Sequence, residues 1–141
     1  MGITLESKNF SIDMGYGGFR NLRIKVAELT GKEIGDHYKY LEDGMFKSGK
    51  ERKEFFEKYD QKISDLADKF KIPSGILDFI YSSDCEGDLT YGRCKQIYKV
   101  IENYDNNICY GYCGRKDCAT FKDFKQIIKD CIDNKCKMKW R

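Results

Sequence analysis

The stretch Met14-Gly15-Tyr16-Gly17-Gly18-Phe19-Arg20-Asn21-Leu22-Arg23 separates two kinds of sequence pattern. Before it, apolar and polar residues alternate, which is typical of a β-strand. After it, apolar residues recur every three or four positions, which is typical of a helix. The stretch is therefore predicted to form a turn from a strand into a helix. It combines three glycines, two aromatic residues and two arginines.

The composition of this turn makes it a candidate binding site for an anion or a nucleotide. A helix N-terminus presents unpaired backbone N–H groups and a partial positive charge, and glycines let a ligand approach the backbone closely. An aromatic ring could stack on a base, and an arginine could contact phosphate. The predicted ligand-binding residues are Tyr16, Gly17, Gly18, Phe19, Arg20 and Arg23.

Two well-known phosphate motifs do not describe the turn. A P-loop ends in Lys followed by Ser or Thr, and the spacing of Gly15, Gly17 and Gly18 differs from that of G-x-G-x-x-G. The alternative interpretation is a tight structural turn whose aromatic rings belong to the core. The sequence leaves open whether these side chains face a ligand or the core.

The segments around the turn also have clear patterns. Residues 2–14 alternate and are predicted to form a β-hairpin. Helical spacing predicts a helix over residues 19–29, weakened or ended by Gly31 and Gly35, and one further helical turn near residues 37–41. Residues 42–44 and 48–49 are interpreted as loop.

Later in the chain, side chains that can cap a helix precede three amphipathic segments, and proline precedes a fourth. The predicted helices are residues 51–70 after a Ser48-x-x-Glu51 capping box, residues 76–81 after Pro73, residues 91–101 after Thr90, and residues 121–132 after Asp117 or Thr120. Residues 108–113 could be a short extended segment. The alternating tail from Cys136 to Trp140 predicts a terminal strand, which could be an edge strand beside the N-terminal hairpin.

These elements predict an α+β fold in one domain, residues 1–141, with about five helices packed on a small antiparallel sheet. The net charge of +3 is too small to demand a nucleic-acid or membrane partner. No apolar run approaches the roughly 20 residues of a membrane helix, and the N-terminus lacks the pattern of a signal peptide. We therefore expect a cytoplasmic protein whose seven cysteines are reduced.

Other chemistry has weaker support. None of the cysteine spacings is C-x2-C, so reduced thiols are favoured over a zinc site, and no metal or other cofactor is predicted. The acidic loop at residues 82–88 does not fit a calcium-binding pattern. The single histidine, His37, is expected at the surface or in an interface, and no catalytic residue is predicted, although a carboxylate-only hydrolase remains an alternative. Lys135, Lys137, Lys139 and Arg141 could bind a nucleic-acid backbone, although no nucleic-acid-binding signature is present.

The opening Met1-Gly2-Ile3, the segment from Asp13 to Phe19 followed by Leu22-Arg23, and the closing Phe121-x-x-Phe124 helix with Trp140 resemble a group of small proteins of bacteriophages and prophages of Gram-positive bacteria. The resemblance implies a context and no particular activity. In that context we expect a non-enzymatic binder in the bacterial host cell that sequesters a nucleotide-derived immune signal. Its partner would be a small nucleotide-like ligand, and the protein could form a homo-oligomer. The alternatives are an inhibitor that binds a host defence protein and a nucleic-acid-binding accessory protein.

Overall fold

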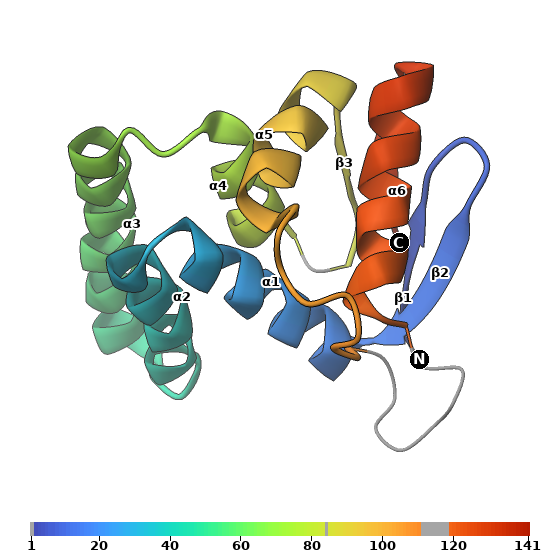
Figure 1. The fold of residues 1–141 in the computed structure, drawn as a ribbon. Coiled ribbons are helices and arrows are strands. Elements are labelled where there is room, and N and C mark those ends of the chain that lie inside the picture. Colours follow the sequence, from blue (N-terminus) through green and yellow to red (C-terminus); the bar gives the residue numbers. More distant parts are fainter. Residues whose placement is uncertain (1, 84, 111–118) are drawn as a thin grey trace.

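The computed structural model describes residues 2–83, 85–110 and 119–141, which form an α+β fold as predicted (Figure 1). The described part contains six helices, against the expected number of about five, and four strands. In chain order the elements are β1 (Gly2–Glu6), β2 (Ser11–Gly15), α1 (Tyr16–Thr30), α2 (Lys32–Met45), α3 (Gly49–Phe70), α4 (Ser74–Tyr81), β3 (Gly87–Leu89), α5 (Tyr91–Ile101), α6 (Phe121–Asn134) and β4 (Met138–Trp140).

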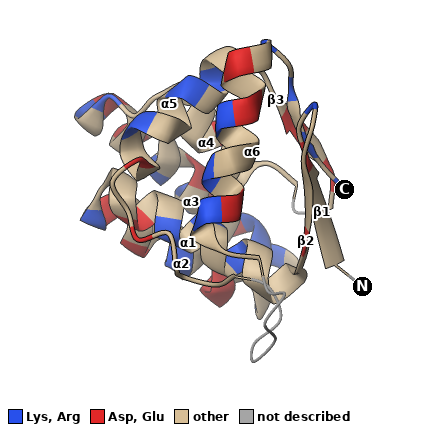
Figure 2. Cartoon of the chain, turned by 45° about the vertical axis from the view of Figure 1, so that its right-hand side comes forward, with Lys and Arg blue, Asp and Glu red and all other residues tan. Residues whose placement is uncertain are grey.

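The four strands form one antiparallel sheet in the order β2-β1-β4-β3. Its inner face carries the apolar residues of the alternating pattern, so that Ile3 pairs with Met14, and Leu5 lies between Ile12 and Trp140. The helices cover this face only, as Figure 2 shows with the sheet seen nearly edge-on. The sheet is therefore apolar toward the helices and polar toward solvent, which is the reason for the period of two in the sequence.

The predicted N-terminal hairpin and the turn that follows it are both confirmed. Strands β1 and β2 pair from Gly2 opposite Gly15 to Glu6 opposite Ser11. Gly15 ends β2 and is also the N-cap of α1, so the chain passes from strand to helix without a loop. Tyr16, Gly17 and Gly18 consequently belong to the first turn of α1.

Two of the predicted helix caps are confirmed and one is wrong. The Thr90 hydroxyl accepts a hydrogen bond from the Arg93 amide at 3.4 Å, and Thr120 forms a reciprocal capping box with Asp123. Ser48 precedes α3 but its side chain makes no capping hydrogen bond. The reason is the next residue, because Gly49 has a φ of +59°, and this left-handed start does not bring the first-turn amides to the serine. Asp117, the other predicted cap of α6, lies outside the described residues.

The prediction of a single helical turn and a loop between residues 37 and 44 is wrong, because α2 continues to Met45. Two glycines of α2, which the sequence pattern suggested would interrupt the helix, instead allow the neighbouring helices to pack closely against it. A Cβ atom on Gly35 would lie 3.0 Å from the Cα of Glu28 in α1, and one on Gly44 would lie 2.2 Å from the Phe55 ring of α3. Contact with neighbouring helices thus outweighs the low helix propensity of glycine.

The end of the sheet differs from the prediction at two points. Gly87 and Asp88, which were expected to be loop, form strand β3 together with Leu89; Gly87 lies against the Trp140 ring and Leu89 is buried. The terminal strand β4 lies beside the hairpin as expected, but β3 covers its other side, so it is an inner strand. Of the predicted extended segment, Cys109 forms an isolated bridge with Thr120, and residues 111–113 lie outside the described part.

Helix α3 lies at the end of the molecule farthest from the sheet (Figure 1). Only Phe55, Tyr59 and Leu66 of its 22 residues are buried. Its main neighbour is α2, with which it forms a helical hairpin. The space between this hairpin and the body of the protein forms the candidate site.

Candidate functional site

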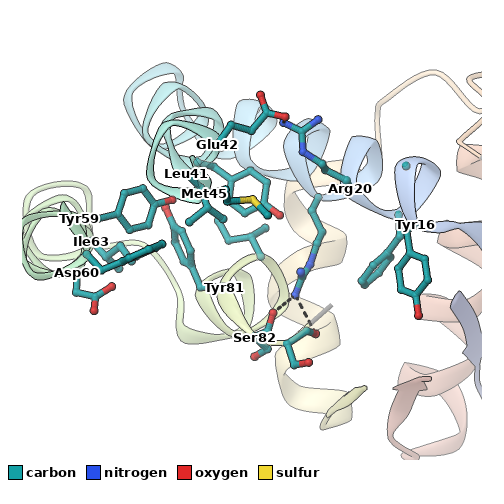
Figure 3. Close-up of a pocket in the computed structure, with 17 residues that line it drawn as sticks. Tyr16, Arg20, Leu41, Glu42, Met45, Tyr59, Asp60, Ile63, Tyr81 and Ser82 are labelled. Atoms are coloured by element: carbon teal, nitrogen blue, oxygen red, sulfur yellow. Dashed lines mark hydrogen bonds and ion pairs between the residues drawn. The ribbon is translucent and has the colours of Figure 1, made fainter. Parts of the chain in front are cut away.

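A cleft of about 600 Å³ opens where four helices approach one another: the start of α1, the end of α2, the middle of α3 and the end of α4 (Figure 3). We call it the four-helix cleft. Its volume falls within the range of small-molecule sites, roughly 300–1,000 Å³. It is lined by Tyr16, Gly17, Phe19, Arg20, Arg23, Tyr38, Leu41, Glu42, Met45, Phe56, Tyr59, Asp60, Ile63, Ile80, Tyr81, Ser82 and Ser83.

The structure brings five of the six predicted ligand-binding residues to this cleft. They are Tyr16, Gly17, Phe19, Arg20 and Arg23, while Gly18 is buried in the first turn of α1 and does not line it. The five residues differ in exposure and in bonding, so they cannot all have the role that the sequence suggested.

The N-terminus of α1 is open toward the cleft. Gly15, its N-cap, provides no side-chain acceptor, and the first amides of a helix have no carbonyl partner within the helix. A Cβ atom on Gly17 would meet no other atom within 4 Å, so the space beside this first turn is free. Tyr16 beside it is 40% exposed. This end of the cleft suits a negatively charged group next to a planar ring.

The two arginines of the predicted site have different environments. Arg20 forms an ion pair with Glu42 across the cleft mouth, with 2.6 Å between Nη2 and Oε1, and both side chains are about half exposed. Arg23 is only 4% exposed; its Nε donates to the Phe79 carbonyl at 2.8 Å and its Nη2 donates to the Ser82 carbonyl. Arg20 can therefore turn toward a ligand at little cost, whereas Arg23 stabilises the wall formed by α4 and the residues after it.

Phe19 also serves the core. It is 1% exposed, and its ring lies 5.9 Å from the Phe79 ring and 6.1 Å from the Trp140 ring, measured between centroids. Phe19 therefore agrees with the alternative interpretation of the turn, in which the aromatic rings belong to the core. Tyr16 remains the ring of the turn that a ligand could stack on.

The opposite wall of the cleft includes Tyr59 and Tyr81, which form a buried aromatic cluster with His37, a residue that does not itself line the cleft. The His37 ring stacks on Tyr59 at 3.9 Å between centroids, and its Nδ1 lies 3.0 Å from the Tyr81 hydroxyl oxygen. His37 was expected at the surface or in an interface; it does not lie at the surface, since only 8% of it is exposed. In the sequence, Tyr59 and Tyr81 were indistinguishable from ordinary apolar positions of amphipathic helices, so no local signal identified the cluster.

Burial determines the charge of this cluster. It lowers the pKa of His37, so the imidazole is neutral at pH 7. Burial also raises the pKa of the Tyr59 and Tyr81 hydroxyls, so both keep their protons. The cluster of His37, Tyr59 and Tyr81 is thus uncharged but polar. Two of its polar atoms, His37 Nε2 and the Tyr59 hydroxyl, are buried and have no hydrogen-bond partner among the described residues.

The cysteines give no indication of a metal site in residues 2–83, 85–110 and 119–141, where no three His, Cys, Asp or Glu side chains are placed to hold an ion. Cys94 and Cys131 are fully buried in the core, as their positions on apolar helix faces suggested. Cys113 and Cys118 lie outside the described residues.

Two of the four basic side chains of the C-terminal tail, Lys137 and Arg141, form ion pairs with acidic residues of neighbouring strands. Lys137 lies 4.0 Å from Asp88, and Arg141 lies 3.0 Å from Glu6. On the outer face of the sheet, Lys139 is flanked by Glu6 and Asp88 in the register of β1 and β3. This arrangement balances the positive charge locally, and the uniform basic surface that binds a phosphate backbone is not formed by these residues.

Comparison of the chain with models of protein families, with curated proteins and with solved structures gave no match. Within the described residues, no helix combines the length and the apolar character that crossing a membrane requires. The functional argument therefore depends on the geometry of the four-helix cleft.

Proposed function

We propose that this protein is a non-enzymatic binder that captures a small nucleotide-like ligand in the four-helix cleft. This proposal is supported by three features that lie in one cleft of suitable size. They are an open helix N-terminus, the exposed Tyr16 ring, and Arg20, which can leave its exposed ion pair with Glu42. Backbone amides and an arginine would bind an anionic group, and aromatic side chains would contact a planar ring.

The charges of the cleft favour a ligand with few negative charges. Arg20 and Arg23 are balanced by Glu42 and Asp60, which line the same cleft. A polyphosphate would meet two carboxylates in addition to two arginines, one of which is already bonded to backbone carbonyls. A ligand with one phosphate or phosphodiester group fits this balance better.

The biological role that we propose is the sequestration of a nucleotide-derived signal that activates host defence, carried out in the cytoplasm of a bacterial host by a phage or prophage accessory protein. This role is based on the resemblance to small phage proteins and on the size and lining of the four-helix cleft. Capture without turnover is sufficient for such a role.

The first test uses two glycines in equivalent positions. Gly17 and Gly92 each follow the tyrosine that begins a helix, and a Cβ atom on either would meet no atom within 4 Å. Gly17→Ala fills space at the cleft mouth, whereas Gly92→Ala makes the same change on α5. We expect both variants to be as stable as the wild type, and only Gly17→Ala to weaken ligand binding.

Binding is measured by calorimetry and thermal unfolding with nucleoside monophosphates, cyclic nucleotides and ADP-ribose. Ribose 5-phosphate and inorganic phosphate are the controls that lack a ring. A ligand present at 100 times its Kd should raise the free energy of unfolding by about 2.7 kcal/mol. If none of these compounds stabilises the wild-type protein, or if Gly17→Ala and Gly92→Ala bind equally well, the proposed site is wrong.

A second candidate function is inhibition of a host defence protein by direct binding. It is favoured by two apolar side chains at the tip of the α2–α3 hairpin, since Met45 is 64% exposed and Phe46 is 90% exposed. Exposed apolar groups of this kind occur at protein interfaces. Replacing Phe46 with Ser would abolish capture of a host protein in this case and would leave nucleotide binding unchanged.

A further inference from the structure

We infer that the Tyr59 hydroxyl donates a hydrogen bond to an acceptor on the ring of the bound ligand, so that the four-helix cleft selects a heterocycle bearing a ring nitrogen or carbonyl over a plain aromatic ring. This inference rests on the proposed function, because it concerns the same cleft. It assigns to α3 the recognition of the ring and to α1 the recognition of the anionic group.

The first observation is that Tyr59 lines the cleft with an unused polar atom. The residue is 4% exposed, and its hydroxyl makes no hydrogen bond with the described part of the chain. Native structures seldom leave a buried hydroxyl in this condition, because losing its hydrogen bonds to water without replacement is unfavourable. A ligand acceptor at this position would remove that cost.

The neighbouring groups determine the polarity of the contact. The Tyr81 hydroxyl is already paired with His37 Nδ1 at 3.0 Å. The Tyr59 hydroxyl interacts with that of Tyr81 but makes no well-formed hydrogen bond among the described residues, so it can turn its proton to a ligand. Because burial raises the pKa of Tyr59, the hydroxyl keeps its proton and can act as a donor. The ligand group that would use this proton is an acceptor, such as a carbonyl oxygen or an unprotonated ring nitrogen.

The arrangement of the two ends of the cleft gives the orientation of the ligand. Figure 3 shows Tyr16 and Arg20 on one side, on α1, and Tyr59 on the opposite side, reaching from α3 toward Tyr81. A ligand that contacts both sides carries its anionic group at one end and its hydrogen-bonding ring edge at the other. A nucleoside monophosphate has this arrangement, since the phosphate and the pairing edge of the base lie at opposite ends of the molecule.

The experiment removes one partner of the proposed hydrogen bond at a time: the hydroxyl on the protein, or the acceptor on the ring of the probe. Tyr59→Phe removes only the hydroxyl. Uridine and inosine monophosphates carry acceptors on the ring, whereas benzyl phosphate joins a plain ring to the same anionic group. Affinities of wild-type protein and variant for the three probes are measured by calorimetry. Tyr110→Phe is the matched control, because the Tyr110 hydroxyl is also buried without a partner among the described residues but does not line the cleft.

We expect Tyr59→Phe to weaken binding of the two nucleotides about tenfold, the typical effect of one hydrogen bond. Its affinity for benzyl phosphate should stay within about twofold of the wild-type value, and Tyr110→Phe should change neither. The thermal midpoint of Tyr59→Phe should change little, because the hydroxyl makes no well-formed hydrogen bond with the described residues.

Three results would overturn the inference. If Tyr59→Phe leaves nucleotide affinity unchanged, the hydroxyl does not contact the ring. If it weakens all three probes equally, its effect is structural. If Tyr110→Phe has the same effect as Tyr59→Phe, the effect is not specific to the cleft. In each case binding by the wild-type protein still supports the proposed function. Failure of the wild-type protein to bind any nucleoside monophosphate, cyclic nucleotide or ADP-ribose would contradict the proposed function itself.

Discussion

Arg20 and Arg23 lie one turn apart on α1 but have different surroundings. The structure separates them by what surrounds each guanidinium group. Arg20 contacts a single exposed carboxylate, and Arg23 is enclosed by the Phe19 ring, 4.8 Å from its centroid, and by backbone carbonyls of the α4 end. One arginine is therefore available to a ligand, and the other holds the wall of the cleft.

This difference predicts opposite outcomes for stability and binding. Arg23→Ala should lower the free energy of unfolding by about 2–4 kcal/mol, because hydrogen bonds to a charged donor are lost and buried carbonyls lose a partner. Arg20→Ala should lower it by less than about 1 kcal/mol, as expected for an exposed ion pair. Urea denaturation measures both values.

Glu42→Ala serves as the control for Arg20→Ala, because it breaks the same ion pair but keeps the arginine. It should have the same small effect on stability, and it should strengthen nucleotide binding where Arg20→Ala weakens it. Equal destabilisation by Arg20→Ala and Arg23→Ala would contradict the separation of their roles.

At the scale of secondary-structure elements, local signals predicted those parts of the fold in which a few neighbouring residues decide the outcome. Thr90 and Thr120 were identified as caps because a hydroxyl reaches an amide three residues away. The β1–β2 hairpin was identified by its period of two. The full length of α2 and strand β3 were missed. Gly44 is tolerated in α2 because it packs against the Phe55 ring of α3, and Gly87 belongs to β3 because it packs against the Trp140 ring of β4; neither contact can be recognised from the residues next to the glycine.

Another long-range contact attaches the hairpin to α6. The Asp130 carboxylate accepts hydrogen bonds from the Ser7 hydroxyl at 2.6 Å, the Asn9 amide at 2.8 Å and the side-chain amides of Asn9 and Asn134 at 2.9 and 2.8 Å. These bonds, that from Ser7 foremost, hold the pKa of Asp130 below its usual value. The ionised carboxylate therefore binds its partners more strongly in the folded protein than water does in the unfolded chain.

This contact predicts a pH dependence of stability. The contribution of a carboxyl group with a lowered pKa is fully present above the pKa of the unfolded chain, about 3.9, and is lost as the pH falls toward the lower pKa of the folded state. Asp130→Asn should be less stable than the wild type at pH 7, and this difference should shrink as the pH falls below about 4. Denaturation with urea at several pH values measures it.

The control is Asp133→Asn, which changes an exposed carboxyl group on the same helix. It should change stability by no more than about 0.5 kcal/mol at pH 7. A difference between the wild type and Asp130→Asn that stays constant from pH 7 to pH 3 would show that the charge of Asp130 does not hold the hairpin.

At the scale of the whole molecule, the fold class could be predicted from the sequence, but only one of the two sides of the candidate cleft could be. The turn at Tyr16 and Gly17 identified one side of the cleft, since the helix N-terminus is a local feature. The other side consists of Tyr59 and Tyr81, which come from helices that meet α1 only in the folded protein. Their periodic spacing indicates burial but does not reveal that a cleft adjoins them.

The position of α3 also predicts how stability is distributed. Most of the core lies between the sheet and α1, α4, α5 and α6, whereas α3 buries three of its 22 residues and packs mainly on α2. Backbone amides of a segment with few buried contacts open with a lower free energy than those of the core. Hydrogen exchange followed by mass spectrometry should therefore show weaker protection for peptides of α3 than for peptides of α6.

The same measurement connects this distribution of stability to the cleft. Because Tyr59 and Asp60 of α3 form one wall, a nucleotide that contacts both walls should slow exchange in α3 more than in α6. Phe121 and Phe124 anchor α6 in the core, so its peptides provide the internal reference. Equal protection of α3 and α6 in the free protein would contradict the proposed distribution of stability. Slower exchange at α1 alone on adding nucleotide would confine the ligand to the helix N-terminus and exclude α3 from the site.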